Sequence, residues 1–403
     1  MFERQIITTL LRYIDTPELL LLTGARQTGK TTALRQLNDK LGQQGKIVHY
    51  ITLEDPEYLR LLNEHPDRIW QIIPRREGVH QVVMIDEIQY LQNPAHFLKY
   101  HFDLNRDRLK LIVTGSSAFY LDKHFDDSLA GRKRLFHLPT LNVAEFLTFR
   151  GRQDLAAALD AVNVELPDLK GLPIAQRREI LSLSQEYLLY GGYPAVVLAA
   201  TIQDKQDILY DLFTSFLKRD FLESGITQVD KAYHLFKLLA FQIGGELNKN
   251  SLANEIGISK PVLESMLTTL QSTFHLNLVR PFYRGNPKEL RKMPKLYLMD
   301  LGMRNAVLKN YALPEDREDI GKLYENFIYR YFHDYMPRSD IQYWRTQSGQ
   351  EVDFIIDGKR GFEVKWNGRQ LKDSKYAKFM DIYPEIKLSF IVRNNSTEAT
   401  LLF

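Results

Sequence analysis

The chain has 403 residues, of which 44% are hydrophobic and 26% are charged, the composition of a soluble globular protein that should divide into roughly two to four domains. Its 53 lysines and arginines barely outnumber its 50 aspartates and glutamates, a balance that neither requires nor excludes a polyanionic partner. The absence of cysteine excludes disulfides, thiolate zinc sites and cysteine nucleophiles, and the lack of a signal-peptide layout or a long apolar run favours a cytoplasmic protein with no membrane partner.

Short apolar runs near the start of the chain predict an α/β domain, which we place at residues 1–150. Four runs that resemble buried strands alternate with helical or loop segments, and this alternation indicates a mostly parallel sheet. A fifth candidate strand closes the region. The five runs span residues 18–24, 46–53, 81–87, 109–117 and 132–141.

A phosphate-binding motif, GARQTGKTT, follows the first of these strands directly and satisfies the pattern G-x-x-x-x-G-K-[ST]. Its glycines let backbone N–H groups turn toward phosphate, Lys30 supplies a positive charge for the β- and γ-phosphates, and Thr31 can hold Mg²⁺ through its hydroxyl. The alternative is a glycine turn that happens to carry a lysine, which the flanking strand and helix disfavour. The residues predicted to bind ATP are Gly24, Ala25, Arg26, Gln27, Thr28, Gly29, Lys30, Thr31 and Thr32.

Two acids at the end of the third strand predict the second half of an ATPase site. Asp86 ends an apolar run and can hold Mg²⁺ through water, and Glu87 stands where ATPases place the residue that orients the attacking water. Thr114 or Ser116, after the next strand, is a candidate sensor of the γ-phosphate, although either hydroxyl could simply satisfy a strand end. Arg132 is a candidate arginine finger, and we favour the alternative of a solvated charge.

Helical patterns dominate the middle of the chain, and the sequence GGYP at residues 191–194 is expected to interrupt them. We place a helical lid at residues 151–228 and a winged helix at residues 229–290. Within the latter, Ser251 is predicted to cap a short helix that ends near Gly257. Ser259 should cap a second helix, which leads into the strand of a wing. The exposed positions expected on this second helix are poorly suited to reading base edges; they are Lys260, Glu264, Ser265 and Thr268.

A cluster of basic residues follows in the wing region. Such a cluster could neutralise the phosphates of duplex or single-stranded nucleic acid without reading its sequence. The equally weighted alternative is a packing module whose charges are merely solvated. The cluster contains Arg280, Arg284, Lys288, Arg291, Lys292 and Lys295, with Tyr283 among them.

Near the end of the chain, two apolar runs that flank Asp357 and Gly358 both carry acids. A turn there would pair the two runs and bring Asp353 close to Glu363, with Lys365 on the same face as Glu363. Two carboxylates and a lysine match the chemistry of metal-dependent phosphodiester hydrolysis. The alternative is an ordinary solvated strand face, which Asp353 disfavours because a buried carboxylate needs a partner.

Taken together, the motifs resemble the AAA+-like bacterial and archaeal ATPases that carry a C-terminal domain of unknown function. The resemblance covers nearly the whole chain in the right order, through the segments GARQTGKTT, VVMIDEIQ, LIVTGSS, LAGR, LPTLNVAEFL, GGYPAVV and PKLYLMDLGM. It implies a core that binds ATP and Mg²⁺, a winged-helix middle domain, and a restriction-endonuclease-like domain, which we place at residues 291–403. Because AAA+-type chains often form rings, it also leaves room for a homo-oligomer.

The C-terminal acids are similar in turn to the D-(x)n-(D/E)-x-K signature of restriction-endonuclease-like folds. That resemblance implies a third acid on the preceding helix, and Glu325 in KLYENFIYRYF is the matching residue. It makes Glu325, Asp353 and Glu363 candidate metal ligands. The candidate catalytic residues of this site are Asp353, Glu363 and Lys365.

Two functions from different classes follow. The first is an Mg²⁺-dependent ATPase that acts on or near nucleic acid and carries a metal-dependent nuclease domain. The second is a nucleotide-dependent regulatory switch whose C-terminal domains bind partners without cleaving them. Intact Asp353, Glu363 and Lys365 favour the first, whereas the near-neutral charge and the weak recognition helix favour the second.

Overall fold

The chain divides into two compact units. The first comprises Met1–Pro139 with Ser272–Phe274, and the second comprises Thr140–Gln271 with His275–Phe403. The four-part division expected from the sequence is finer than this and stays a prediction. The computed structural model describes residues 2–76, 78–115, 129–162, 169–284, 293–346, 348–368, 375–394 and 400–401. Four residues singled out above lie outside the described residues, namely Ser116, Lys288, Arg291 and Lys292.

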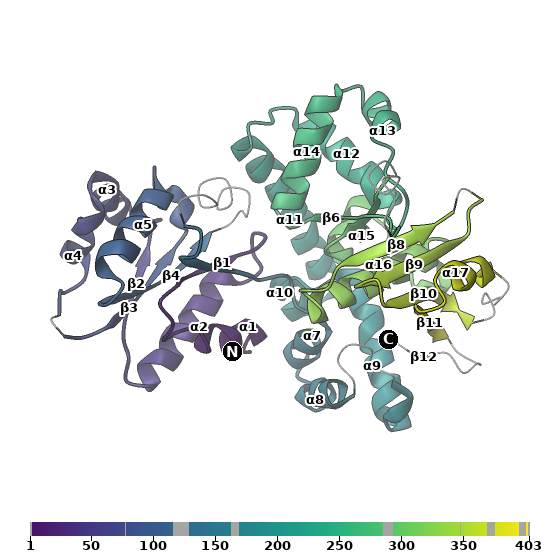
Figure 1. Cartoon of the computed structure of the whole chain (residues 1–403), viewed down its shortest axis with the longest axis horizontal. Helices are drawn as coiled ribbons and strands as arrows, with labels where there is room; N and C mark the ends of the chain where they lie inside the picture. Colours follow the sequence, from purple (N-terminus) through teal and green to yellow (C-terminus); the bar gives the residue numbers. More distant parts are fainter. Residues whose placement is uncertain are drawn as a thin grey trace. The chain divides into compact units, whose positions relative to one another are not determined.

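The described strands of the first unit form a five-stranded parallel sheet in the order β2-β3-β4-β1-β5 (Figure 1). This confirms the predicted α/β domain. The strands are β1 (Leu19–Thr23), β2 (Ile47–Thr52), β3 (Gln81–Asp86), β4 (Leu109–Gly115) and β5 (Lys133–His137). The helices are α1 (Gln5–Leu11), α2 (Lys30–Gln43), α3 (Pro56–Glu64), α4 (Ile69–Ile72) and α5 (Pro94–Asn105).

Helices cover both faces of this sheet. Leu20 and Leu22 of β1 pack with α1 and α2 on one face, while Leu19 and Leu21 pack with α3, α4 and α5 on the other. A strand covered on both faces must be apolar at nearly every position, which explains the continuous leucine run of β1. Because the strands are parallel, their carboxyl ends meet at one edge, where the ends of β3, β4 and β1 are neighbours.

The second unit begins with helices in the region expected to be helical. Asn142 and Glu145 form a capping box at the start of the first helix. The expected interruption is confirmed, because α9 ends at Tyr190, its C-cap Gly191 has a φ of 72° that suits glycine, and Pro194 opens α10. The helices are α7 (Val143–Phe149), α8 (Gln153–Ala161), α9 (Ile174–Tyr190), α10 (Pro194–Leu198), α11 (Ile202–Glu223) and α12 (Val229–Phe241).

Two short helices and a two-stranded sheet follow, in the order that a helix-turn-helix with a wing would have. The predicted cap of the first helix is wrong. Asn248 is the N-cap, and its Oδ1 accepts hydrogen bonds from the N–H groups of Asn250 and Ser251, so Ser251 lies inside the helix. The expected end of this helix at Gly257 and the expected exposed positions of the next helix are confirmed. The winged helix itself stays a prediction. The elements are α13 (Lys249–Ile256), α14 (Lys260–Ser272), β6 (Leu276–Val279) and β7 (Lys295–Leu298).

The last part of the second unit contains a mixed sheet, in the order β12-β11-β10-β9-β8 for the described strands (Figure 1). β8, β9 and β10 are antiparallel, and β10, β11 and β12 are parallel. Phe332 of α16 packs against Phe354 of β9 and Phe362 of β10, so this helix lies on the sheet. The restriction-endonuclease-like assignment stays a prediction. The elements are α15 (Leu301–Leu308), α16 (Ile320–Tyr335), β8 (Ile341–Arg345), β9 (Glu351–Ile356), β10 (Arg360–Asn367), α17 (Ala377–Ile382), β11 (Lys387–Asn394) and β12 (Thr400–Leu401).

The hairpin between β9 and β10 sets the register of the C-terminal acids. Asp357 and Gly358 have φ values of 54° and 61°, the left-handed conformation that tight hairpin turns require. Extending the antiparallel ladder by one residue places Asp353 opposite Glu363. The predicted pairing of the two apolar runs is therefore confirmed.

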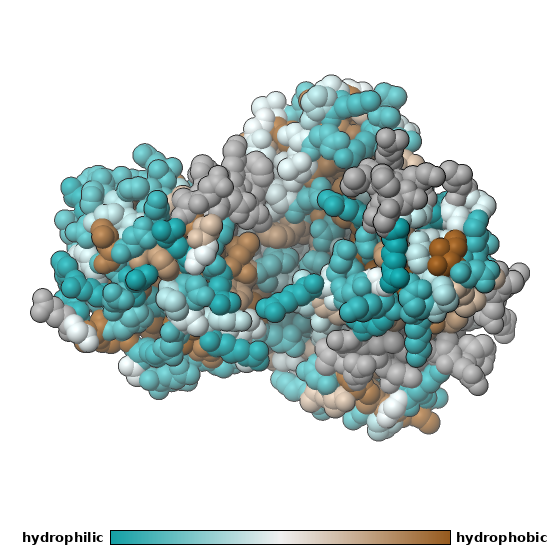
Figure 2. All heavy atoms as spheres, viewed as in Figure 1, coloured by the Kyte–Doolittle hydropathy of each residue, from teal (hydrophilic) through white to brown (hydrophobic). Residues whose placement is uncertain are grey.

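The surface seen in Figure 2 is mainly hydrophilic, and hydrophobic side chains lie on it in separate small areas. Within the described residues, no helix is long and apolar enough to cross a membrane. Even α11, with 22 residues, carries charges along its length, among them Lys205, Asp211 and Lys218.

Candidate functional site

The loop between β1 and α2 has a backbone that requires its two glycines. A Cβ atom on Gly24 would lie 2.3 Å from the carbonyl oxygen of Leu138, closer than any side chain tolerates. Gly29 has a φ of 95° at the N-cap of α2, in the left-handed region that favours glycine. The loop leads into the N-terminus of α2, whose first N–H groups have no acceptor within the helix and suit an anion.

Lys30 is folded back on this loop. Its Nζ donates hydrogen bonds to the carbonyl oxygens of Gly24 at 3.0 Å and Ala25 at 2.9 Å, and the residue is 6% exposed. Arg4, which the sequence did not single out, donates to the carbonyl oxygen of Thr28 at 2.6 Å and so braces the loop. These two carbonyl oxygens are neutral, and charged phosphate oxygens would bind the same ammonium more strongly than they do.

Asp86, at the end of β3, accepts hydrogen bonds from three hydroxyl groups. Thr31 Oγ1 donates to Asp86 Oδ2 at 2.8 Å, Tyr50 OH donates to the same oxygen at 2.7 Å, and Thr114 Oγ1 donates to Oδ1. Burial and the bond to Asp86 raise the pKa of Tyr50, so its hydroxyl remains a neutral donor. Thr31, Asp86 and Thr114 come together as expected, whereas Tyr50 was missed because only the placement of β2 beside β3 reveals it.

Glu87 follows Asp86 in the left-handed conformation, with a φ of 60°. Its N–H donates to Thr114 Oγ1 at 3.1 Å, and its carboxylate accepts a hydrogen bond from Gln89 Nε2. A non-glycine residue in this conformation is uncommon, and such positions cluster at active sites. The backbone of Glu87 is thus tied to the end of β4, beside Asp86.

These groups fit a nucleotide with Mg²⁺. A threonine hydroxyl and a carboxylate are oxygen ligands of the kind that Mg²⁺ prefers, and those of Thr31 and Asp86 are already in contact. Lys30 and the N-terminus of α2 supply the positive charge and the N–H donors that phosphate needs.

In the second unit, the side chain of Lys295 lies among three acids. Its Nζ is 3.0 Å from Glu325 Oε1 and 3.5 Å from Asp353 Oδ1, and it also contacts Glu351 Oε1. Tyr297 OH donates to the same oxygen of Glu325 at 2.6 Å. The lysine side chain is 1% exposed. Lys295 and its three acids, together with two residues of β10, form a group that we call the carboxylate–lysine centre. Its members are Lys295, Glu325, Glu351, Asp353, Glu363 and Lys365.

The other half of the centre joins Asp353 to Glu363. Val364 N–H donates to Asp353 Oδ2 at 2.9 Å, and Lys365 Nζ lies 3.8 Å from that oxygen. Lys365 also donates to Glu363 Oε1, which accepts a hydrogen bond from Tyr376 OH at 2.8 Å. Glu363 is 1% exposed, and its Oε2 is buried with no hydrogen-bond partner among the described residues. The alternative of a solvated strand face is therefore wrong for this residue.

Burial shifts the protonation of these groups. Burial and repulsion from Asp353 raise the pKa of Glu325 to about 7 and that of Glu363 to about 7, against the attraction of the neighbouring lysines. Burial alone would lower the pKa of Lys295, but the surrounding carboxylates outweigh it and raise that pKa well above its usual value. Burial alone would also lower the pKa of Lys365, but the neighbouring carboxylates of Asp353 and Glu363 outweigh it and raise that pKa. Both lysines are therefore charged, while two of the acids exchange protons near neutral pH.

The centre does not fit a divalent metal in the expected place. Oxygens of Glu325, Glu351 and Asp353 lie within 4.8 Å of one another, close enough to share a cation. The ammonium of Lys295 already contacts all three residues, and Mg²⁺ would need the same oxygens at about 2.0–2.1 Å. Glu363, the expected third ligand, has its Oε1 engaged by a lysine and a tyrosine.

The predicted surface position of Lys295 is wrong. This lysine was expected in a surface cluster that neutralises phosphates, but it is buried and paired with acids. Of the other described members of that cluster, Arg280 is exposed, and Arg284 forms an ion pair with Glu385. The available signal was strand alternation, because Lys295 and Tyr297 are the polar residues on one face of an otherwise apolar strand.

Two other members of the site were missed. Glu351 precedes Asp353 by two residues on β9, a spacing that places both on one face and could have been noticed. Tyr376 comes from the segment before α17 and has no sequence signal.

In the first unit, the candidate arginine finger Arg132 forms an ion pair with Asp103 at 3.1 Å, in keeping with the favoured alternative of a surface charge.

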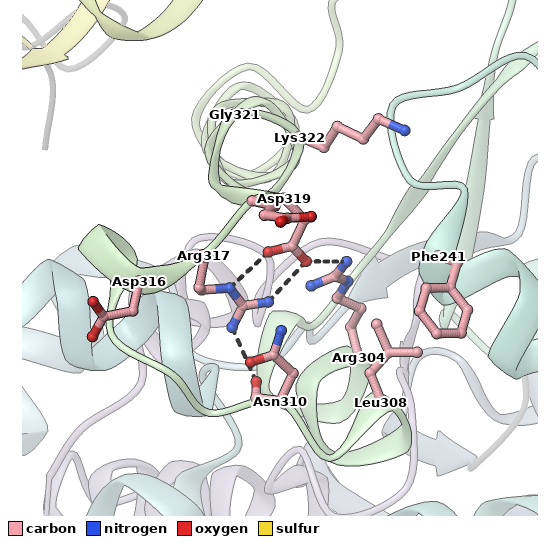
Figure 3. Close-up of a pocket in the computed structure, with 10 residues that line it drawn as sticks. Phe241, Arg304, Leu308, Asn310, Asp316, Arg317, Asp319, Gly321 and Lys322 are labelled. Carbon is pink, nitrogen blue, oxygen red and sulfur yellow. Dashed lines mark hydrogen bonds and ion pairs between the residues drawn. The ribbon is translucent and has the colours of Figure 1, made fainter.

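A cavity of about 710 Å³ lies elsewhere in the second unit, near the end of α15 and the start of α16 (Figure 3). Among the residues that line it, Asp319 forms ion pairs with Arg304 at 2.6 Å and with Arg317 at 2.8 Å, and Phe241 and Leu308 are apolar. Both buried arginines of this cavity share Asp319 as an ion-pair partner. The cavity is therefore weaker evidence for a ligand site than the two groups of residues described above.

Three families match successive parts of the chain. Residues 16–147 match an AAA domain, residues 182–313 match a domain of unknown function (DUF8612), and residues 320–401 match another (DUF4143). The first match includes the β1–α2 loop and the end of β3. The match to the AAA domain therefore spans all five strands of the parallel sheet and the phosphate-binding loop.

Similar chains occur in bacteria and archaea. An uncharacterised protein of Mycobacterium tuberculosis is 24% identical over 90% of this chain and 74% of its own length. One from Methanocaldococcus jannaschii is 24% identical over 85% of this chain and 73% of its own length. The solved structure of the RuvB Holliday junction branch migration motor of Thermotoga maritima is 16% identical, with a TM-score of 0.35, and covers 72% of this chain and 94% of that chain. A TM-score of this size supports no argument about function.

Proposed function

We propose that the first unit binds and hydrolyses ATP with Mg²⁺. The observation that carries this proposal is the hydrogen-bonded group of Thr31, Asp86 and Thr114 beside the buried ammonium of Lys30. These residues come from the separate segments at the ends of β1, β3 and β4, and together they supply the groups that phosphoryl transfer to water requires. The AAA-domain match of residues 16–147 supports the same reaction.

Each residue has a separate task in this proposal. Lys30 leaves the carbonyl oxygens of its own loop for the β- and γ-phosphates, which the N–H groups of the loop also bind. Thr31 and Asp86 would hold Mg²⁺, which when bound neutralises charge on the phosphates. Glu87 orients the attacking water, and Thr114 holds the backbone of Glu87 through the hydrogen bond at 3.1 Å.

Two substitutions separate binding from hydrolysis. Lys30→Ala should abolish ATP binding and turnover, because it removes the charge that meets the phosphates. Glu87→Gln should bind ATP normally and lose turnover by about 10²–10⁴-fold, the contribution of a positioned base. Titration with a fluorescent ATP analogue measures binding, and phosphate release measures turnover. Lys99→Ala and Glu57→Gln, at exposed positions of the same unit, are the matched controls.

The two results have different consequences. Hydrolysis at the wild-type rate in Glu87→Gln would remove the role assigned to that carboxylate but leave the nucleotide site standing. Hydrolysis at the wild-type rate in Lys30→Ala would remove the whole proposal.

We further propose that ATP turnover controls what the second unit binds, and that its partner is nucleic acid held without sequence readout. Arg280 after β6 and Lys260 on α14 support a phosphate-binding role, because both are exposed and positively charged. A mobility-shift assay at low salt should show binding that Arg280→Glu weakens. Binding that is absent at low salt, or unchanged by charge reversal, would contradict the proposal.

Sedimentation with and without ATP measures whether a homo-oligomer forms.

For the second unit, partner binding without cleavage is favoured over nuclease activity. The observation that supports this preference is Lys295, whose ammonium lies where a metal would bind the acids. Incubation of the protein with ATP, Mg²⁺ or Mn²⁺, and DNA or RNA, with phosphate release and strand integrity followed together, tests both functions. Metal-dependent cleavage that disappears in Asp353→Ala and in Lys365→Ala would establish the nuclease instead.

A further inference from the structure

Lys295 is enclosed along its whole side chain. It is the first residue of β7 and is 1% exposed, and its backbone forms an isolated bridge with Glu246. Its Nζ lies 5.5 Å from the ring centroid of Tyr343. A lysine held this way loses the solvation of a surface ammonium and must be compensated by charges within the protein.

The compensation comes from three acids on two elements. Glu325 is supplied by α16, and Glu351 and Asp353 are supplied by alternate positions of β9. Without the lysine, their carboxylate oxygens would lie within 4.8 Å of one another around a buried point, as the ligands of a cation do. Three uncompensated carboxylates at this depth would repel one another strongly. A cation among them relieves this repulsion, and the chain supplies one in Lys295.

We propose that the ε-ammonium of Lys295 is the resident cation of the carboxylate–lysine centre. It occupies the place of a divalent metal, keeps metal away from Glu325, Glu351 and Asp353 in the intact protein, and leaves a metal site behind when it is removed. This assignment concerns the second unit alone, so it stands or falls independently of ATP hydrolysis in the first unit.

Titration of the full chain with Mn²⁺ in the absence of nucleotide, followed by the loss of the electron paramagnetic resonance signal of free Mn²⁺, tests this proposal. Lys295→Met keeps the length of the side chain and removes its charge. It should acquire one Mn²⁺ site that binds at least about tenfold more tightly than anything in the wild type, because three carboxylates then share the ion. The double variant Lys295→Met/Asp353→Asn should lose that site. Any weak binding near Asp86 is common to all these proteins and cancels in the comparison.

Arg345→Met is the matched control. Arg345 also forms an ion pair with Glu351, at 3.3 Å, but its side chain is 37% exposed, so its removal should leave Mn²⁺ binding as in the wild type. Wild-type protein that binds Mn²⁺ as tightly as Lys295→Met would overturn the proposal, as would folded Lys295→Met without a site. If neither Lys295→Met nor Lys295→Gln folds, the wild type and Asp353→Asn decide: equal Mn²⁺ binding supports the proposal, and weaker binding in Asp353→Asn overturns it.

Discussion

Replacement of Glu325 by glutamine should remove a pH dependence of stability that arises in the carboxylate–lysine centre. Glu325 accepts a hydrogen bond from Tyr297 and lies 3.0 Å from Lys295, and its side chain is 14% exposed. Burial, with repulsion from Asp353, raises its pKa from 4.5 to about 7. Glutamine keeps the size and the acceptor oxygen of this side chain but cannot ionise.

The sign follows from proton linkage. Because the pKa is higher in the folded state, the folded protein binds the proton more tightly than the unfolded chain does. The stability that this proton contributes is fully present below the unfolded pKa of 4.5 and is lost as the pH rises through about 7. Integration between about pH 5.5 and about pH 8 gives a loss of about 2 kcal/mol for this one carboxyl. The free energy of unfolding of Glu325→Gln should therefore gain about 2 kcal/mol relative to the wild type over that interval.

The two units can be distinguished by their tryptophans. Trp70 belongs to the first unit, and Trp344 and Trp366 belong to the second. In a Trp70→Phe background, urea unfolding followed by tryptophan fluorescence reports the second unit, and the experiment is repeated across the pH range with a chelator present. Glu255→Gln, at an exposed position on α13, is the control and should leave the pH dependence unchanged. Stability curves for wild type and Glu325→Gln that stay parallel from acid to alkaline pH would refute the reasoning.

Three further substitutions test other parts of the structure. Gly24→Ala should abolish ATP binding, measured by titration with a fluorescent analogue, because its Cβ would lie 2.3 Å from the carbonyl oxygen of Leu138; normal affinity would contradict the loop geometry. Tyr50→Phe should raise the Mg²⁺ concentration that half-saturates ATP hydrolysis by at least about tenfold, since Asp86 loses one donor worth roughly 1.5 kcal/mol or more; an unchanged requirement would separate Tyr50 from the metal site. Phe332→Ala should lower the stability of the second unit by about 3–5 kcal/mol in urea unfolding, because the ring is fully buried; a loss below about 1 kcal/mol would show that the site collapses around the gap.

The nucleotide site could be predicted because its chemistry lies in contiguous segments. The glycines, Lys30 and Thr31 follow one apolar strand within a few residues, and Asp86 and Glu87 end another. Parallel pairing then brings the strand ends together without further information. Tyr50 could not be predicted, since its contact with Asp86 depends on which strand lies beside β3, and β2 and β3 are separated by two helices.

The C-terminal centre could be predicted only where its contacts are local. Asp353 and Glu363 meet across a hairpin whose turn is evident in the sequence. Lys295 lies among acids that follow it by 30 residues or more, so strand alternation near Lys295 could not identify its partners. Whether a lysine is buried depends on the residues that surround it in the fold. The sequence alone therefore favoured the surface position, which is commoner for lysine.

The two buried lysines differ in what a ligand must replace. The ammonium of Lys30 donates to two carbonyl oxygens of its own loop, and a phosphate offers charged oxygens that bind it more strongly than these do. The ammonium of Lys295 is held by three carboxylates, so an incoming anion would compete with charges that are already in place, and an incoming cation would meet a positive charge. By this reasoning the first site is poised to exchange its internal contacts for a ligand, whereas the second is closed by its own lysine. The acids of the carboxylate–lysine centre therefore form an ion network whose charges are balanced within the chain, without a metal.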